Sequence, residues 1–345
     1  MAVTIRDVAR AARVSVATVS RVLNSKDSVT EATRERVLEA IRGLHYVPHG
    51  GARSLTTRRT HVVGVVLPEM IGAFFSEIIR GIDRVARPEG YHVLVSGSHS
   101  EAAETRAVLR ALHGRVDGLI LMVPGPDVDC LDQSLPPQTP VLLLHGAGET
   151  GLPTLRVDNW RGARLAVDHL LDLGHRHIAL LGGPGGNADA EERRAGYRDA
   201  FADRGLDPDR HLEVPGDFRE ESGFAAAAHI ARLTPRPTAV FAANDAMAIG
   251  CLAGLRAAGL DVPADISLVG FDDVPIARYL TPALTTVRVP IAEIGVRAME
   301  RMLGLMLGED EPGERDEVVV PTLSIRESSL AAGSAAIRNP KEERP

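Results

Sequence analysis

The sequence predicts an α/β protein in which a small all-α segment precedes a large core of parallel sheets. Two observations support this prediction. After residue 60, short runs rich in Val, Leu and Ile alternate with helical segments, a pattern typical of parallel sheets with helices on both faces. Before residue 48, apolar residues instead repeat at helical spacing.

Residues 5–12 form the first predicted helix, because their apolar residues repeat at i, i+3, i+4 and i+7 and make one stripe. Thr4 stands at the N-cap position, and Asp7 three residues later provides a weaker form of the capping box. A short turn follows. Ser15 can then cap a second helix, in which Val19 faces the first.

The second predicted helix has a small, partly basic outward face, made of Val16, Ala17, Thr18, Ser20 and Arg21. Two short helices joined by a tight turn, with such residues near the start of the second, are typical of a helix-turn-helix. An ordinary surface helical hairpin is the alternative interpretation.

A third helix and an unusual linker follow. Thr30 can cap the helix, whose predicted buried stripe consists of Val37, Leu38, Ile41 and Leu44. The helix ends at Tyr46-Val47-Pro48, because proline disfavours helix in the residue before it. The next segment, HGGARSLTTRRT, is basic and contains small residues.

The motifs VSVATVSRVLN, TRERV, Y-x-P and ARSL occur in this order, and together they resemble the LacI/GalR family of bacterial transcription regulators. The resemblance extends to about residue 330. It implies a sequence-specific DNA-binding regulator, most simply a repressor, whose operator affinity is controlled by a small-molecule effector. It also implies a homodimer on near-palindromic double-stranded operator DNA.

The helix-turn-helix and the resemblance together assign the expected DNA-binding residues. These are Thr4, Ser15, Val16, Ala17, Thr18, Ser20, Arg21, Asn24, Ala52, Arg53 and Leu55. Val16, Ala17 and Arg21 are expected to read the major groove, where Arg21 can bond guanine bidentately. By resemblance, residues 49–57 form a hinge helix that inserts Leu55 into the minor groove as a wedge.

Three departures from the family pattern stand out. Arg13 replaces the glycine usual in the turn of the helix-turn-helix, where a left-handed conformation costs an arginine about 1 kcal/mol. His49-Gly50-Gly51 replaces Asn-Ala-x, and glycine weakens the expected hinge helix by about 0.5–1 kcal/mol per position. His145-Gly146 stands where Asp-Arg is common after the fourth strand.

Seven apolar runs predict the strands of the core: VVGVVLP, YHVLVSG, VDGLILMV, VLLLHG, HIALLGG, TAVFAAN and DISLVGFD. About 270 residues are too many for one such sheet, so two lobes are expected. The resemblance implies a two-lobed, parallel-sheet, periplasmic-binding-protein-like core with three crossing strands. We expect the crossings near Leu155–Asp158, Thr286–Pro290 and Val320–Thr322.

These inferences divide the chain into four parts. The expected parts are a helix-turn-helix DNA-binding domain (1–48), a hinge helix or linker (49–59), an effector-binding and dimerisation core (60–330) and a disordered tail (331–345). Within the core, the N-lobe is expected at about 60–156 and 290–320, and the C-lobe at about 157–289 and 321–330.

Ligands of such folds bind beyond the carboxyl ends of the strands. Residues that fall at strand ends or match family positions are the expected effector-binding residues: Phe74, Phe75, Arg193, Phe218, Asn244 and Asp272. An arginine, a carboxylate, an amide and aromatic rings can grip a polar ring. A sugar or sugar derivative is therefore the expected effector, with a purine or nucleoside as the alternative.

Several of these residues also have a purely structural interpretation. Arg193 and Asp272 could form a plain salt bridge, and Phe74 or Phe75 could simply pack in the core. Trp160, the only tryptophan, could either pack or line the rim of the binding site.

Composition and motifs argue against other classes of protein. Residues 1–59 carry 11 Lys and Arg against 5 Asp and Glu, whereas the whole chain has a net charge of −7. A basic segment on an acidic body suits phosphate contacts at one end. A solute-binding protein for uptake would need a signal peptide and would have no use for residues 1–59. Neither a signal peptide nor a membrane span is apparent, so we expect a cytoplasmic protein.

No constellation of catalytic residues is apparent, and we expect neither enzyme activity nor a cofactor. An enzyme acting on sugars would need paired carboxylates, and only Asp272 is placed convincingly. Cys130 and Cys251 lack metal-ligand spacing, and His175 and His177 alternate along a strand, so no metal is expected. GGPGGNADA lacks the spacing of a phosphate-binding loop and is interpreted as a strand-to-helix connection.

Overall fold

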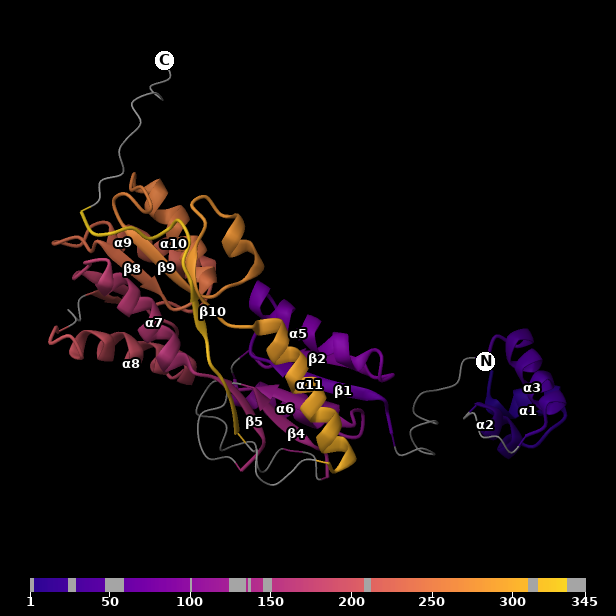
Figure 1. Ribbon diagram of the computed structural model, residues 1–345. Coiled ribbons are helices and arrows are strands. Elements are labelled where there is room, and N and C mark those ends of the chain that lie inside the picture. The colour runs from indigo at the N-terminus through magenta and orange to yellow at the C-terminus, as the bar shows by residue number, and fades with distance from the viewer. Residues whose placement is uncertain are drawn as a thin grey trace, which may run out of the picture. The chain divides into compact units, whose positions relative to one another are not determined.

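The computed structural model describes residues 3–23, 29–46, 59–99, 101–123, 135, 138–144, 151–207, 212–309 and 316–333 of the 345-residue chain. They fall into two compact units, Met1–Thr60 and His61–Pro345 (Figure 1). In its described part, the first unit contains helices, and the second combines helices with two sheets. The predicted α/β fold class with an all-α N-terminal segment is therefore confirmed.

The first unit, called the head below, consists of α1 (Ile5–Ala12), α2 (Val16–Leu23) and α3 (Glu31–Gly43). Their apolar faces share one core, in which Val8, Val19 and Val37 are fully buried. Each of the three helices thus contributes one side of a small amphipathic bundle.

Both helices of the helix-turn-helix begin at the predicted caps. The hydroxyl and the N–H of Thr4 donate to the Asp7 carboxylate at 2.7 and 3.0 Å, and these bonds hold the pKa of Asp7 below its ordinary value. At the start of α2, Ser15 Oγ accepts the N–H of Thr18 at 3.0 Å. The bonds from the N–H groups of Thr4 and Thr18 satisfy amides that a helix leaves unpaired at its start.

The predicted burial of Leu38 in α3 is wrong. Leu38 is 41% exposed, whereas Val37 is buried and Ile41 and Leu44 pack against the head core. Positions 37, 41 and 44 lie on one face of a helix, but position 38 is rotated from position 37 by about 100°. Leu38 therefore leaves the buried stripe.

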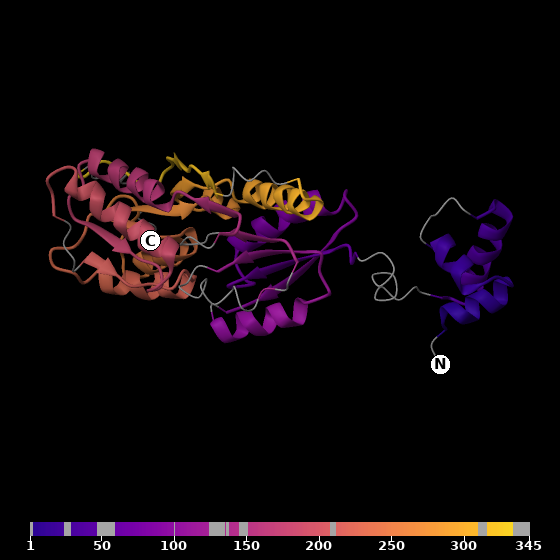
Figure 2. The same cartoon turned by 90° about the horizontal axis from the view of Figure 1, so that it is seen from below.

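The N-lobe of the second unit is built on a six-stranded parallel sheet in the order β11-β5-β4-β3-β1-β2. Its strands are β1 (Val62–Leu67), β2 (His92–Gly97), β3 (Gly118–Met122), β4 (Val141–Leu144), β5 (Thr154–Val157) and β11 (Asp316–Val319). Helices α5 (Ala73–Ala86) and α11 (Ile291–Leu307) cover one face, and α6 (Ala102–Leu112) covers the other (Figure 2).

The side chains of β1 point alternately to the two faces of the N-lobe sheet, which explains why helices cover both faces. Val63 and Val65 belong to the core beneath α5 and α11, whereas Val66 belongs to the core beneath α6. Successive strand residues point to opposite faces, so a strand that is apolar throughout must be buried twice. The buried pattern of β1 thus follows directly from its continuous apolar sequence.

The C-lobe has a second six-stranded sheet, in the order β12-β10-β9-β8-β6-β7, with only β12 antiparallel to its neighbour among these strands. Its strands are β6 (Ile178–Leu181), β7 (Glu213–Val214), β8 (Ala239–Ala242), β9 (Ser267–Asp272), β10 (Thr285–Arg288) and β12 (Thr322–Ser324). Helices α7 (Asn159–Asp172) and α8 (Ala188–Ala202) pack together, as do α9 (Glu220–Ile230) and α10 (Asp245–Ala257). A 3₁₀ helix, η3, spans Pro275–Tyr279.

The chain passes between the two sheets at three places in the described residues. It leaves β5 for α7 at Asp158, leaves β10 for α11 at Pro290, and joins β11 to β12 through Val320 and Pro321. The Asp158 N–H donates to the Val319 carbonyl at 3.0 Å, which links the first and third crossings directly.

Each of the seven apolar runs predicted as strands contains one, namely β1, β2, β3, β4, β6, β8 and β9. The short strand β7 was not predicted. At the C-terminus, Ala332 donates its N–H to the Leu173 carbonyl at 2.8 Å, while residues 334–345 of the predicted tail lie outside the described residues. Among the described residues, no helix has the length and apolar character needed to cross a bilayer.

Candidate functional site

The outer face of α2 carries the predicted DNA-reading residues. Val16 is 42% exposed, and Ala17 and Arg21 are also exposed. Ser15 and Thr18 share a hydrogen bond of 2.8 Å between their hydroxyls, so both also serve the local helix start. Of the other predicted contacts, Thr4 is exposed and Ser20 is half-buried. Asn24, Ala52, Arg53 and Leu55 lie outside the described residues, as do Gly50 and Gly51.

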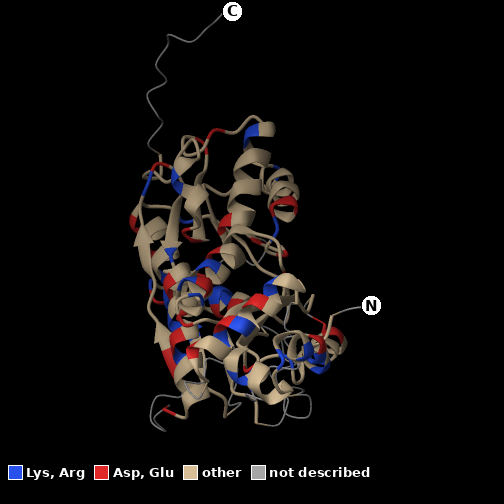
Figure 3. Ribbon diagram, turned by 90° about the vertical axis from the view of Figure 1, so that its right-hand side faces the viewer, with Lys and Arg blue, Asp and Glu red and all other residues tan. Residues whose placement is uncertain are grey.

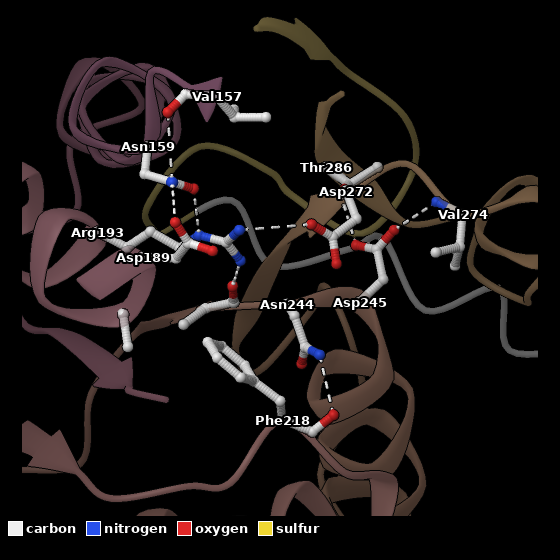
Figure 4. Close-up of polar contacts among 12 residues, drawn as sticks. Val157, Asn159, Asp189, Arg193, Phe218, Asn244, Asp245, Asp272, Val274 and Thr286 are labelled. Atoms are coloured by element: carbon white, nitrogen blue, oxygen red, sulfur yellow. Dashed lines mark hydrogen bonds and ion pairs between the residues drawn. The ribbon is translucent and has the colours of Figure 1, made fainter. Parts of the chain in front are cut away.

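In the C-lobe, Arg193 lies at the centre of a polar network (Figure 4). Its side chain projects from α8, and the residue is only 5% exposed. Nε donates to Oδ1 of Asn159 at 2.8 Å, and Nη1 donates to the Ala243 carbonyl. Nη2 lies 3.7 Å from Oδ1 of Asp272, close enough for an ion pair but too far for a good hydrogen bond.

Two aromatic rings flank the same guanidinium. Its carbon lies 3.7 Å from the ring centre of Phe271 and 5.6 Å from that of Phe218. Phe218 itself adopts a left-handed backbone conformation with φ 70°. Its ring occupies the space that a Cβ on Gly183 would need, so only glycine leaves room for this ring at the end of β6.

Asp272 ends β9 in an unusual backbone conformation, with φ 114°, and Asp273 follows with φ 56°. Contacts on both sides hold this segment. Arg326 donates to Asp273 at 2.6 Å, and the Val274 N–H donates to Oδ2 of Asp245 at 2.9 Å. Strained residues persist where their surroundings determine the conformation, and they tend to occur at functional sites.

Asp245 lies fully buried behind Asp272 (Figure 4). Its Oδ1 accepts the Thr286 hydroxyl at 2.6 Å. Burial raises the pKa of Asp245 well above its ordinary value, and the negative charge of Asp272 raises it further. Asp245 therefore favours its neutral form.

Asn244 lies where it was predicted, at the end of β8, but its amide is already engaged. Oδ1 accepts the Met247 N–H at 2.9 Å and caps α10, while Nδ2 donates to the Phe218 carbonyl at 2.9 Å. Asn244 thus holds the aromatic platform in place. A direct contact from Asn244 to an effector stays a prediction.

The N-lobe supplies Phe74 and Phe75 from the first turn of α5. Both are half-buried and pack against the core, and their rings meet edge to face at 5.5 Å. The two lobes are bridged nearby, because Glu69 after β1 pairs with Arg219 before α9 at 2.7 Å. The carboxyl ends of β1 and β7 therefore approach each other across the lobes.

Trp160 packs on the surface between α7 and α8. Its Nε1–H donates to Asp199 at 2.8 Å, and the Arg164 guanidinium lies 5.2 Å above its ring centre. Basic and acidic residues are interspersed along the ribbon (Figure 3), and at the other end of α7 Arg204 pairs with Asp172 at 2.5 Å. The residue is 39% exposed, and a place at the rim of the binding site stays a prediction.

Arg193 and Asp272 are each hydrogen-bonded to a segment where the chain crosses from one lobe to the other. Asn159, which bonds Arg193, comes directly after the first crossing. The Asp272 carbonyl accepts the N–H of Val289, at the second crossing, at 3.2 Å. A change in the spacing of Arg193 and Asp272 would therefore act directly on two of the three crossings.

Sequence reasoning missed Asn159 and Asp245, although each offers a signal. Both are polar and follow an apolar strand at the start of a helix, within VDN and NDA. The segment GGPGGNADA joins β6 to α8, as predicted. In GGPGGNADA, Asn187 accepts the Ala190 N–H at 3.0 Å and caps α8, as expected of a plain strand-to-helix loop. His145 and Gly146 lie outside the described residues, which contain no group of three potential metal-ligating side chains.

Comparisons with known proteins place both units in one family. Residues 4–49 match the family described as bacterial regulatory proteins, lacI family, and residues 167–329 match a periplasmic binding protein-like domain. The chain is 37% identical over 330 residues to the HTH-type transcriptional regulator GalR of Escherichia coli, covering 94% of this chain and 95% of that protein. It is 35% identical over 329 residues to the repressor PurR of Photobacterium profundum, covering 94% and 98%.

The solved structures agree with these relatives. The Lac repressor dimer bound to operator and the anti-inducer ONPF superposes with a TM-score of 0.85 at 32% identity, covering 96% of this chain and 100% of that one. A complex of the regulator CelR with cellobiose gives 0.72 at 32% identity, with coverage of 95% and 100%. These relatives are transcriptional regulators rather than enzymes, and they confirm the predicted effector-controlled, DNA-binding regulator. The chain belongs to the LacI family of bacterial regulatory proteins.

Proposed function

We propose that this protein represses transcription by binding a near-palindromic operator as a homodimer, and that a sugar or sugar derivative controls this binding. The observation that carries the effector half of the proposal is the buried pair formed by Arg193 of α8 and Asp272 at the end of β9. A guanidinium and a carboxylate 3.7 Å apart, with Phe218 beside them, suit a polar ring that offers both donors and acceptors.

The relatives support a sugar over the purine alternative. One is named a ribose operon repressor, and two similar structures contain cellobiose and ribose. PurR is similar to the same degree, so identity alone does not decide the effector. The network adds no feature that favours a purine, because Asn244 already uses its amide within the protein.

In this proposal the DNA contacts come from the head. Val16, Ala17 and Arg21 read base edges in the major groove, and Thr4, Ser15, Thr18 and Ser20 contact the backbone around them. Asn24, Ala52, Arg53 and Leu55 extend the contacts, with Leu55 acting as a minor-groove wedge. The assigned boundaries are a DNA-binding domain (1–48), a hinge (49–59), a two-lobed core (60–330) and a tail (331–345).

The regulatory step follows from the tethers of the effector site. A hydroxyl that bonds both Arg193 and Asp272 changes their spacing, and this change reaches Asn159 and Val289 at the two crossings. The lobes, and with them the hinges of the dimer, then favour a different arrangement. The ligand can shift this equilibrium only by its differential affinity for the two arrangements.

The proposal makes the protein a binding protein without turnover, which acts on DNA in the cytoplasm. Phe74 and Phe75 would close the effector site from the N-lobe. Incubation with ribose or cellobiose should leave the sugar chemically unchanged, as chromatography of the mixture can verify.

Selection from a randomised duplex library tests the DNA half of the proposal. The intact protein should enrich a near-palindromic sequence. Arg21→Ala should lose the preference at one base pair of each half-site, at a cost of about 1–3 kcal/mol. Arg36→Ala, which removes an exposed arginine from α3, is the matched control and should enrich the same sequence as the intact protein. Identical enrichment by Arg21→Ala would refute the assigned readout.

Mass spectrometry of small molecules that co-purify with the protein tests the effector half. The expected ligand is a sugar, which should be absent from an Asp272→Asn variant that still folds. A purine bound by the intact protein and lost from the same variant would keep the site but overturn the assigned class of effector.

A further inference from the structure

Arg13 occupies a strained position between α1 and α2. Its backbone is left-handed, with φ 53° and ψ 46°. Its N–H donates to the Arg10 carbonyl at 3.3 Å, and the Val14 N–H donates to the Ala9 carbonyl at 3.0 Å, as in a Schellman motif. Glycine suits this position, since an L side chain crowds the backbone there. The arginine therefore makes the head less stable than a glycine would.

The Arg13 side chain does not recover this stability within the described part of the head. It is exposed, and it has no hydrogen bond or ion pair with another described residue. Asp7, the acidic residue of α1, is already bonded to Thr4 and pairs with Arg10 at 3.4 Å. Among the described residues, no side-chain contact of Arg13 therefore offsets the strain of its backbone.

The position of Arg13 in the motif suggests what its side chain contacts instead. The residue stands two positions before Ser15, the cap of α2, and Val16 and Ala17 follow as exposed residues of the first turn. In a helix-turn-helix, residues at this end of the second helix enter the major groove. The turn that leads into the helix then lies at the rim of the groove, where the phosphates are.

We infer that Arg13 is an additional DNA-contact residue, whose guanidinium binds a backbone phosphate beside the base pairs read by α2. This inference rests on the proposed function and deepens its DNA-binding half. The contact adds affinity for any duplex without adding sequence information, because phosphates are the same at every step. The strained turn thus lowers the stability of the head, while the arginine that it carries raises the affinity of the head for DNA.

The salt dependence of binding to a duplex of arbitrary sequence tests the inference. Each phosphate contact contributes about 0.9 to the slope of log affinity against log salt concentration. For the full-length protein, Arg13→Gly should lower this slope by about 0.9 per head between about 50 and 200 mM salt. The same variant should raise the melting temperature of the head, so weaker binding cannot be blamed on unfolding.

Two further variants separate a specific contact from a general loss of charge. Arg13→Lys keeps the cation and should keep the slope of the intact protein. Arg42→Gln removes one exposed positive charge from the last turn of α3 and should leave the slope nearly unchanged. The inference is overturned if Arg13→Gly keeps the original slope, or if Arg42→Gln lowers it equally. If the intact protein shows no salt-dependent duplex binding, the proposed function itself fails.

Discussion

The outer face of α2 and the Arg193–Asp272 site both rely on arginine, but in opposite environments. Arg21 stands exposed on the head, whereas Arg193 is buried and already contacts Asn159, Ala243 and Asp272. Arg21 can therefore add a contact without giving one up. In the candidate effector site the charged groups are already paired, so a ligand must replace or extend existing interactions.

This difference also affects how strongly each region depends on its charges. Exposed charges interact through water and are screened by salt, and removing one alters stability little. A buried charge that loses its partner leaves an uncompensated group in a low-dielectric setting. Substitutions in the two regions should therefore differ mainly in what they do to folding.

The largest effect is expected for Arg193→Met, which leaves Asp272 buried without its cation. The free energy of unfolding of the core should fall by about 3–5 kcal/mol. Arg198→Met on the same helix removes an arginine that pairs with Glu213 at 2.7 Å but is much more exposed, and it should cost less than about 1 kcal/mol. Urea unfolding of both variants measures the difference, and equal losses would show that the buried arginine matters no more for folding than the exposed one.

Asp245→Asn should change how stability depends on pH. Burial raises the pKa of Asp245 in the folded protein, so its contribution is fully present below the unfolded pKa and is lost as pH rises towards the folded value. Over that window the loss approaches about 1.4 kcal/mol per pH unit. The asparagine variant should lack this slope and gain relative stability above about pH 4.

Urea titrations at a series of pH values check this expectation. Thr286→Val, which removes the hydroxyl donor to Asp245, provides a comparison in which the slope should remain. A parallel pH dependence of the intact protein and Asp245→Asn would show that Asp245 ionises normally.

In the head, Ser15→Ala removes the hydroxyl that accepts the Thr18 N–H. The head should lose about 1 kcal/mol of stability, a typical cost of losing a helix cap. Thr30→Ala is the control, because the Thr30 hydroxyl donates to Thr33 Oγ1 and makes no bond to a backbone amide of α3. Thermal unfolding should show the smaller shift for Thr30→Ala, and the reverse order would argue against this cap.

The smallest effect is expected at the pair of Glu69 and Arg219 between the lobes. Arg219 is largely exposed, so a double-mutant cycle should give a coupling free energy of about 0.2–1 kcal/mol that shrinks with added salt. The double variant with the two charges exchanged, Glu69→Arg with Arg219→Glu, should restore most of this coupling free energy. A coupling free energy of several kcal/mol, as expected for a buried ion pair, would contradict this prediction.

Much of the fold could be predicted because its signals are local. The apolar runs of β1 and β9 and the caps at Thr4 and Ser15 each depend on a few neighbouring residues. Leu38 shows where local reasoning fails, because the direction of the stripe on α3 depends on how the helix is rotated against its neighbours.

The candidate effector site could be predicted only in part, for a related reason. A polar residue at the end of a strand is visible in the sequence, but the partners that consume its hydrogen bonds are not. Asn244 donates to the Phe218 carbonyl, and Asn159, which drew no attention, orients Arg193. Such roles arise from residues 26 to 50 positions apart in the chain, and no local pattern encodes them.

Trp160 gives the protein a built-in optical reporter. It is the only tryptophan of the chain, it follows Asn159 directly, and its indole is held by Asp199 of α8. Its emission therefore comes from one site, next to the residue that links Arg193 to the first crossing. A ligand that moves Asn159 should change the wavelength or the intensity of the Trp160 fluorescence without any added label.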